Sequence, residues 1–170
     1  MNDSLPRATP ARVYERADAE TYRRVLMQTY ADACPAMLDM LRMMDVERRW
    51  VIADRDPVRH WSKGRVTMLG DAAHPTLQSY AQGACMAIED AVALSDCIIA
   101  ANGDFEETFR VYEKQRYLRT ARVILESRAL WEFYHVGGIA REVRNDACRT
   151  RSIEDTWKCL AWIYDGPKYA

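Results

Sequence analysis

The sequence has no long apolar run and no excess of one charge. Its apolar runs are short, as at 97–101, whereas a membrane-spanning helix needs about 20 residues. Lysine and arginine number 24 against 25 aspartate and glutamate residues, so the formal net charge is −1. This balance provides no bulk electrostatic attraction to nucleic acid or to an anionic membrane. We therefore expect neither as a partner, and the polar N-terminus predicts no signal peptide.

Cysteine and histidine are sparse and scattered. The five cysteines form no C-x-x-C pair, and the three histidines form no H-E-x-x-H pattern. The sequence therefore predicts no disulfide framework and no metal site. Reduced thiols in a chain without an apolar leader favour a cytoplasmic protein.

Apolar side chains recur at helical spacing along most of the chain, and 49% apolar with 29% charged residues is a globular composition. Helices are expected over 18–33, from Pro35 onward, and over 83–101, 104–135, 139–148 and 153–163. Short strands are expected at 50–53 and 65–69. Because two strands do not make a stable sheet by themselves, we expect them to belong to a larger sheet.

One segment predicts a binding site at the end of a strand. The strand at 65–69 ends in Gly70-Asp71, and the following loop leads to Gly83, which begins a helix. A carboxylate at a strand end can accept hydrogen bonds from a polyhydroxylated ligand. Glycine at the helix start lets a ligand approach the backbone closely.

The first amides of that helix predict the second half of the site. Those of Ala84, Cys85 and Met86 lack partners within a helix and can bind negative charge. A carboxylate for hydroxyls beside an anion site suits a flavin with its ribityl chain. An ordinary strand-turn-helix unit has the same spacing, so spacing alone leaves both interpretations open.

Two runs of sequence resemble the second FAD-binding motif of class A flavoprotein aromatic hydroxylases, the salicylate hydroxylase and 3-hydroxybenzoate 6-hydroxylase group. They are G-R-V-T-M-L-G-D-A-A-H-P at 64–75 and A-Q-G-A-C-M-A-I-E-D-A at 81–91. Weaker resemblance covers nearly everything after residue 13. It implies an α/β fragment: the C-terminal part of the PHBH-type (para-hydroxybenzoate hydroxylase-like) FAD/NAD(P)-binding fold, mostly helical with a few short strands.

The resemblance also implies a division of the chain. The expected parts are a loose lead-in at 1–13, the end of a substrate-domain region at 14–64, an FAD-binding strand-turn-helix segment at 65–101 and a helical region at 102–170.

The resemblance assigns roles to single residues. The implied cofactor contacts are Gly70, Asp71, Pro75, Gly83, Ala84 and Cys85. Asp71 would accept hydrogen bonds from the ribityl chain, and the amides of 83–85 would face the flavin pyrimidine edge. Gln78 would face the aromatic substrate. His74 is a candidate base on the substrate phenol, with a structural role in the loop as the favoured alternative.

The implied activity is hydroxylation of a phenolic aromatic acid, such as 3-hydroxybenzoate or salicylate. FAD would be the cofactor, NADH or NADPH the co-substrate and O2 the oxidant, and the flavin would carry the redox chemistry. A homodimer of the full-length enzyme is left open.

The sequence departs from the family where the ADP part of FAD is held. None of its seven glycines fit G-x-G-x-x-G, and the family's middle Asp-Gly motif is missing. The implied N-terminal Rossmann unit is therefore absent, and we expect the isolated chain to bind FAD weakly or not at all. Three alternatives stay open: part of a working hydroxylase, a flavin hydroxylase of another substrate class, or an inactive remnant or helical interaction module.

Several charged residues are expected to have structural or solvent-exposed roles and no role in catalysis. Asp54 and Asp56 are expected in a polar turn, and Glu89 with Asp90 in a solvated or capping position. A series of basic residues is expected to form a solvated face or intersubunit salt bridges. It comprises Lys114, Arg116, Arg119, Arg122 and Arg128.

Overall fold

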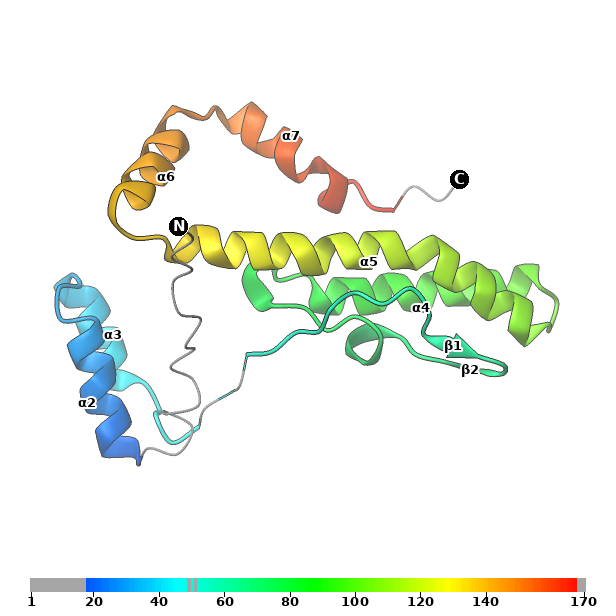
Figure 1. The fold of residues 1–170 in the computed structure, drawn as a ribbon, viewed down its shortest axis with the longest axis horizontal. Coiled ribbons are helices and arrows are strands. Elements are labelled where there is room, and N and C mark those ends of the chain that lie inside the picture. The colour runs from blue at the N-terminus through cyan, green and yellow to red at the C-terminus, as the bar shows by residue number, and fades with distance from the viewer. Residues whose placement is uncertain (1–17, 49, 51, 168–170) are drawn as a thin grey trace, which may run out of the picture. The chain divides into compact units, whose positions relative to one another are not determined.

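The computed structural model describes residues 18–48, 50 and 52–167, and the chain divides into two units after Ile52. The described part of the first unit is a pair of helices, α2 (Ala19–Thr29) and α3 (Pro35–Met43) (Figure 1). Asp18 caps α2 by accepting a hydrogen bond from the Thr21 amide, as predicted, although the helix ends at Thr29 and not at residue 33. The expected lead-in at 1–13 lies outside the described residues.

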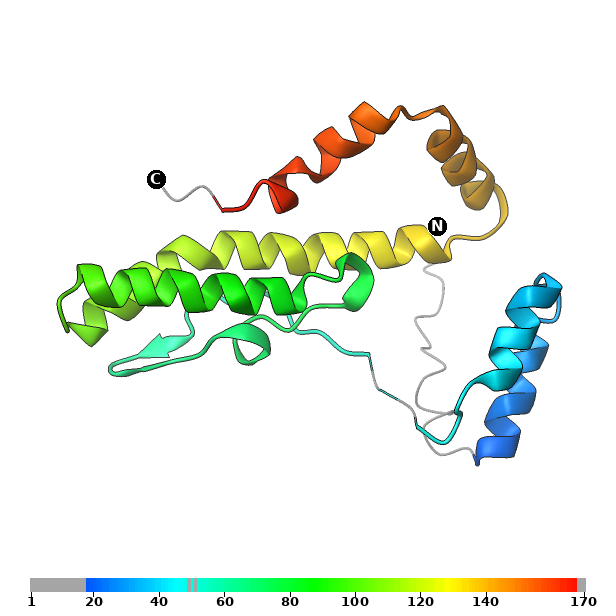
Figure 2. The same cartoon turned by 180° about the vertical axis from the view of Figure 1, so that it is seen from behind.

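The second unit holds the remaining elements. They are β1 (Ser62–Lys63), β2 (Val66–Thr67), the 3-10 turns η1 (Gly70–Ala72) and η2 (Gln78–Tyr80), α4 (Gly83–Ala100), α5 (Phe105–His135), α6 (Gly138–Thr150) and α7 (Ile153–Tyr164). The four helices confirm the predicted ones within a few residues. Helices α4 and α5 lie side by side, as both views show (Figures 1 and 2). None of the described helices has an apolar stretch long enough to cross a membrane.

The strands differ most from the prediction. The expected strand at 50–53 is wrong: Trp50, Ile52 and Ala53 are irregular, and residue 51 lies outside the described residues. Trp50 is 87% exposed, so its apolar character does not reflect a buried strand. The strand predicted at 65–69 is reduced to β2, which pairs antiparallel with β1 in a hairpin.

A buried carboxylate on α5 anchors the hairpin. Glu113 accepts hydrogen bonds from the amides of Trp61, at 2.9 Å, and Ser62, at 2.5 Å. This contact joins residues far apart in the sequence, and strand propensity does not reveal it. The first strand therefore begins at Ser62, where α5 holds the backbone.

The core of this unit lies between α4 and α5. One apolar cluster comprises Trp61, Ala73, Ala93, Cys97 and Tyr112. A second joins Met86, Val123 and Ile163, so that α7 packs against both long helices. Polar and charged side chains are buried in the same layer, and they connect the core to the residues predicted for the site.

Candidate functional site

The site begins at a tight turn after β2. Gly70 opens η1 with a φ of +58°, a conformation that L side chains rarely adopt. A methyl group added to Gly70 would lie 3.3 Å from the Ala87 Cβ on α4. Glycine at this position therefore allows both the backbone turn and its close approach to the helix.

We expect Gly70→Ala to destabilise the chain by about 1–2 kcal/mol through the left-handed backbone alone, and by more through the contact with Ala87. Gly64→Ala is the matched control, because Gly64 has nearly the same φ, +56°, and no atom within 4 Å of the added methyl. Urea unfolding of the two variants measures the difference. Equal losses would show that the approach of η1 to α4 is loose.

The turn places Asp71 beside the start of α4. A methyl group added to Gly83, the first residue of α4, would lie 3.9 Å from the Asp71 Oδ1 and 3.5 Å from Thr76. The Asp71 side chain is exposed. The structure therefore joins the two halves of the predicted site, an accessible carboxylate and a helix N-terminus, at one place.

The first turn of α4 differs from the prediction in one amide. The Met86 amide donates to the Gln82 carbonyl at 2.9 Å, so it is not free for a ligand and that assignment is wrong. The N-cap residue of this helix, Gln82, makes no side-chain capping bond. The amides of Gly83, Ala84 and Cys85 form the uncapped first turn, and the last two residues are exposed.

The loop between η1 and α4 carries the other predicted residues. Pro75 is half-buried, and Gln78 is exposed at the start of η2. Two bonds tie this loop to α5: Thr76 donates to the Ser127 Oγ at 3.1 Å, and the Tyr80 hydroxyl donates to Glu126 at 3.2 Å.

The loop ends in a strained residue. Ala81 has a φ of +54°, a region costly for any residue with a Cβ, and its amide bonds to the Gln78 carbonyl at 2.8 Å. The backbone around Gln78 is therefore held in a defined conformation before α4 begins.

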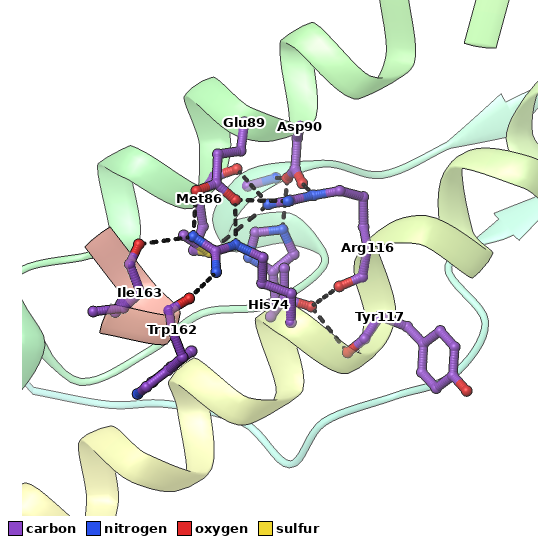
Figure 3. A network of polar contacts seen from close by, with 11 residues as sticks. His74, Met86, Glu89, Asp90, Arg116, Tyr117, Trp162 and Ile163 are labelled. Atoms are coloured by element: carbon purple, nitrogen blue, oxygen red, sulfur yellow. Dashed lines mark hydrogen bonds and ion pairs between the residues drawn. The ribbon is translucent and has the colours of Figure 1, made fainter. Parts of the chain in front are cut away.

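His74 is buried and contacts a carboxylate of α4. It is 3% exposed, and its Nε2 lies 2.6 Å from the Asp90 Oδ2 (Figure 3). An ionised carboxylate only accepts hydrogen bonds, so the protonated Nε2 of His74 donates and Asp90 accepts. The ring also packs edge-on against Trp61. This geometry fits the structural alternative for His74.

Asp90 is the centre of a buried network, which corrects its predicted solvated or capping position. The residue is 0% exposed. Besides the bond from His74, its carboxylate accepts bonds from the Gly70 amide at 2.9 Å and from Arg116 Nε at 2.7 Å. It therefore connects the turn, the loop and α5 to α4.

Glu89 extends the network to α7, so its predicted solvated role is also wrong. Its carboxylate pairs with Arg116 at 2.7 Å and with Arg119 at 2.6 Å. Arg119 further donates to the carbonyls of Trp162, at 2.8 Å, and Ile163, at 3.0 Å (Figure 3). Two carboxylates and two guanidinium groups balance one another in this layer.

Both carboxyl groups are stabilised in the ionised form. Burial raises the pKa of the Asp90 carboxyl. The hydrogen bonds donated to it, the one from His74 foremost, lower its pKa by more than burial raises it, so the net pKa is below its ordinary value. Burial likewise raises the pKa of the Glu89 carboxyl, and its bonds from Arg119 and Arg116 outweigh that effect.

The basic series on α5 is only partly internal, since Lys114 and Arg122 are exposed, as expected. Arg116 is 0% exposed, and Arg128 binds Asp54 and Asp56, at 2.5 Å and 2.8 Å. The expectation of a solvated face is therefore wrong for Arg116, and Arg128 pairs with carboxylates of this same chain. Asp54 and Asp56 lie in irregular backbone, and their carboxylates are ion-pair partners of α5.

A spacing signal could have identified the buried charges. Asp90 falls on the same face of α4 as three core residues, Met86, Ala93 and Cys97. Arg116 likewise interrupts the buried face of α5. The buried residues of that face include Phe109, Tyr112, Thr120 and Val123. A charge within an apolar stripe needs a buried partner, and each of these charges is the partner of the other.

Among residues 18–48, 50 and 52–167, no group of three histidine, cysteine or acidic side chains is placed to hold a metal ion. The five cysteines are free thiols.

Comparisons with known proteins agree with the flavin interpretation of this geometry. The family described as FAD binding domain matches residues 8–127. A 3-hydroxybenzoate 6-hydroxylase of Polaromonas naphthalenivorans (strain CJ2) is 45% identical over 131 residues, which cover 77% of this chain and 33% of the relative. A 3-amino-4-hydroxybenzoate 2-monooxygenase of Streptomyces cremeus is 41% identical over 116 residues, 68% of this chain and 29% of the relative.

A solved structure shows the same fold. The crystal structure of Klebsiella pneumoniae HpxO complexed with FAD and uric acid superposes with a TM-score of 0.78 at 28% identity, over 89% of this chain and 40% of that chain. This chain thus spans about a third of the length of the first curated relatives and somewhat more of the solved neighbour.

Proposed function

Because this chain belongs to the FAD-binding domain family, we propose that it supplies the flavin side of the cofactor site in an FAD-dependent aromatic monooxygenase. The observation that carries the proposal is the placement of the exposed Asp71 carboxylate beside the uncapped first turn of α4. These groups fit the cofactor, since the carboxylate accepts from hydroxyls and the amides bind negative charge. Gly83 leaves open the space between them.

The residues have separate roles in this proposal. Asp71 holds the ribityl hydroxyls, the amides of Gly83, Ala84 and Cys85 face the flavin pyrimidine edge, and Pro75 lies beside the ring. Bound FAD supplies the redox chemistry by which NADH or NADPH and O2 hydroxylate a substrate. The protein binds and orients the reactants and excludes water. His74 has a structural role in this proposal, which its burial against Asp90 supports.

The proposed substrate is a phenolic aromatic acid such as 3-hydroxybenzoate. The 3-hydroxybenzoate 6-hydroxylase of Polaromonas is 45% identical to this chain. A second substrate class is a purine-like ring, favoured by the structural match to HpxO, which was solved with uric acid but is only 28% identical. The higher identity favours the aromatic acid. Free cysteines suit a reducing compartment, so we place the reaction in the cytoplasm.

The test uses a reconstructed enzyme, in which this chain is joined to the part of the Polaromonas relative that it does not span. With FAD, O2 and either NADH or NADPH, we expect 3-hydroxybenzoate to yield 2,5-dihydroxybenzoate, detected by chromatography. Uric acid and 3-amino-4-hydroxybenzoate are the comparison substrates. A folded enzyme that retains FAD but forms no hydroxylated product from any of them would contradict the proposed activity. Size-exclusion chromatography of the same protein tests the homodimer.

We expect Gln78→Leu to leave FAD binding intact and to impair hydroxylation. Gln78 is exposed in the loop beside the site, and its amide can hydrogen-bond the phenol or carboxylate of the substrate. A leucine leaves that group unpaired on desolvation, at a cost of about 1–3 kcal/mol in transition-state stabilisation. Product formed per NAD(P)H oxidised is the measurement.

The control for this variant is Gln28→Leu, which changes an exposed glutamine of α2. It should match the unmodified enzyme in FAD content, turnover and coupling. If Gln78→Leu also matches it in all three, Gln78 does not face the substrate.

A further inference from the structure

The start of α4 and the Gly70–Asp71 turn must keep a fixed spacing if they are to bind one ligand. Asp71 is exposed, so its own side chain does not hold the turn in place. The proposed function requires that another group fix this spacing. Asp90 is on α4 itself, about two turns after Gly83, on a helix whose residues move together.

We propose that Asp90 is the positioning residue of this site, holding the Gly70–Asp71 turn against α4 so that the Asp71 carboxylate stays beside the first turn of the helix. This inference rests on the proposed function, and it adds a role to a residue outside the ligand-contacting set. Asp90 acts through Asp71 and does not touch the ligand.

The contacts of Asp90 carry the inference. Its Oδ2 accepts from the Gly70 amide, which immediately precedes Asp71, and from His74, which precedes the loop with Gln78. Its Oδ1 accepts from Arg116, so α5 fixes the rotation of the carboxylate. One buried group thereby holds both segments that reach the site, and Figure 3 shows its bonds to His74 and Arg116.

An amide cannot replace this carboxylate. All three neighbours of Asp90 donate hydrogen bonds, and an asparagine would turn an NH2 group toward at least one of them. The neighbouring Glu89 shares Arg116 with Asp90, yet no hydrogen bond joins it to Gly70 or His74 in the described part of the chain. Glu89→Gln therefore disturbs the same charge network without releasing the turn.

A double-mutant cycle on FAD affinity tests whether Asp90 acts through Asp71. In the reconstructed enzyme, Asp90→Asn should raise the FAD Kd about tenfold. In an Asp71→Ala background the same change should raise it less than about threefold, because the group being positioned is gone. Equal factors in both backgrounds, or the same rise in Glu89→Gln as in Asp90→Asn, would overturn the proposal.

The exchange rate of the Gly70 amide tests the contact without FAD. In the 170-residue chain, Asp90→Asn should speed hydrogen exchange at Gly70 about tenfold relative to Glu89→Gln. Protection that persists in both variants would overturn the proposal. A reconstructed enzyme that binds no FAD would instead refute the proposed function, and this exchange experiment would still decide the role of Asp90.

If Asp90→Asn does not fold, two substitutions at His74 test the positioning role of Asp90. A glutamine amide can still donate to Asp90, whereas leucine cannot, so His74→Gln should retain FAD more tightly than His74→Leu. Glutamine transfers no proton, and turnover in His74→Gln close to that of the unmodified enzyme supports a positioning role. Equal FAD loss in both variants would count against it.

Discussion

Replacing Arg116 by methionine should destabilise the 170-residue chain by about 3–5 kcal/mol, the cost typical of removing one partner from a buried ion pair. Arg116 is 0% exposed, and its guanidinium binds Asp90 and Glu89. Methionine fills a similar volume but leaves the Asp90 carboxylate without its cationic partner. Urea unfolding, followed by circular dichroism, measures the loss.

Arg110→Met provides the matched control on the same helix. Arg110 is also paired, with Glu107, but the two side chains are 65% and 46% exposed. Exposed pairs contribute little, so this variant should unfold close to the unmodified chain. If Arg116→Met loses no more than Arg110→Met, the buried network does not stabilise the unit.

Asp71→Ala should weaken FAD binding to the reconstructed enzyme about tenfold to a hundredfold. The change removes an ionised acceptor for ribityl hydroxyls, and such a hydrogen bond contributes about 1.5–3 kcal/mol. Asp71 is exposed and lies next to Gly83, so the loss should appear in affinity with little effect on folding. Titration followed by flavin fluorescence measures the Kd.

Asp96→Ala is the control for this change. It removes another exposed carboxylate of the same unit, near the far end of α4. Its FAD affinity should equal that of the unmodified enzyme. An Asp71→Ala enzyme that holds FAD as tightly as Asp96→Ala would show that the ribityl contact is elsewhere.

Local signals predicted the helices of this chain well. Asp18 and Asp104 cap α2 and α5 through their side chains, and each is followed by apolar residues at helical spacing. The glycine and asparagine after α4, at 102–103, end that helix as expected. These features depend only on residues close together in the chain, so they can be predicted from the sequence alone.

The strands and the buried charges depend on distant residues. The hairpin begins at Ser62 because Glu113 on α5 holds its backbone, and nothing near Ser62 signals that contact. Considered singly, Asp90 and Arg116 are each predicted to be charged residues on the surface. Their pairing follows only when both apolar stripes are placed face to face.

The candidate site was predicted residue by residue through its motif, and its role in binding stays a prediction. The structure shows where its members lie, with the Asp71 carboxylate beside Gly83. The motif did not reveal that the Met86 amide is already bonded to Gln82, because that depends on where the helix begins.

We propose that the Gly70–Asp71 turn and the first turn of α4 together hold the flavin. Hydrogen–deuterium exchange of the reconstructed enzyme, with and without FAD, tests it most directly. We expect FAD to slow exchange in peptides covering 70–75 and 82–86, and to leave α2 peptides unchanged. A stoichiometric FAD complex in which both segments exchange as fast as in the FAD-free enzyme would contradict it.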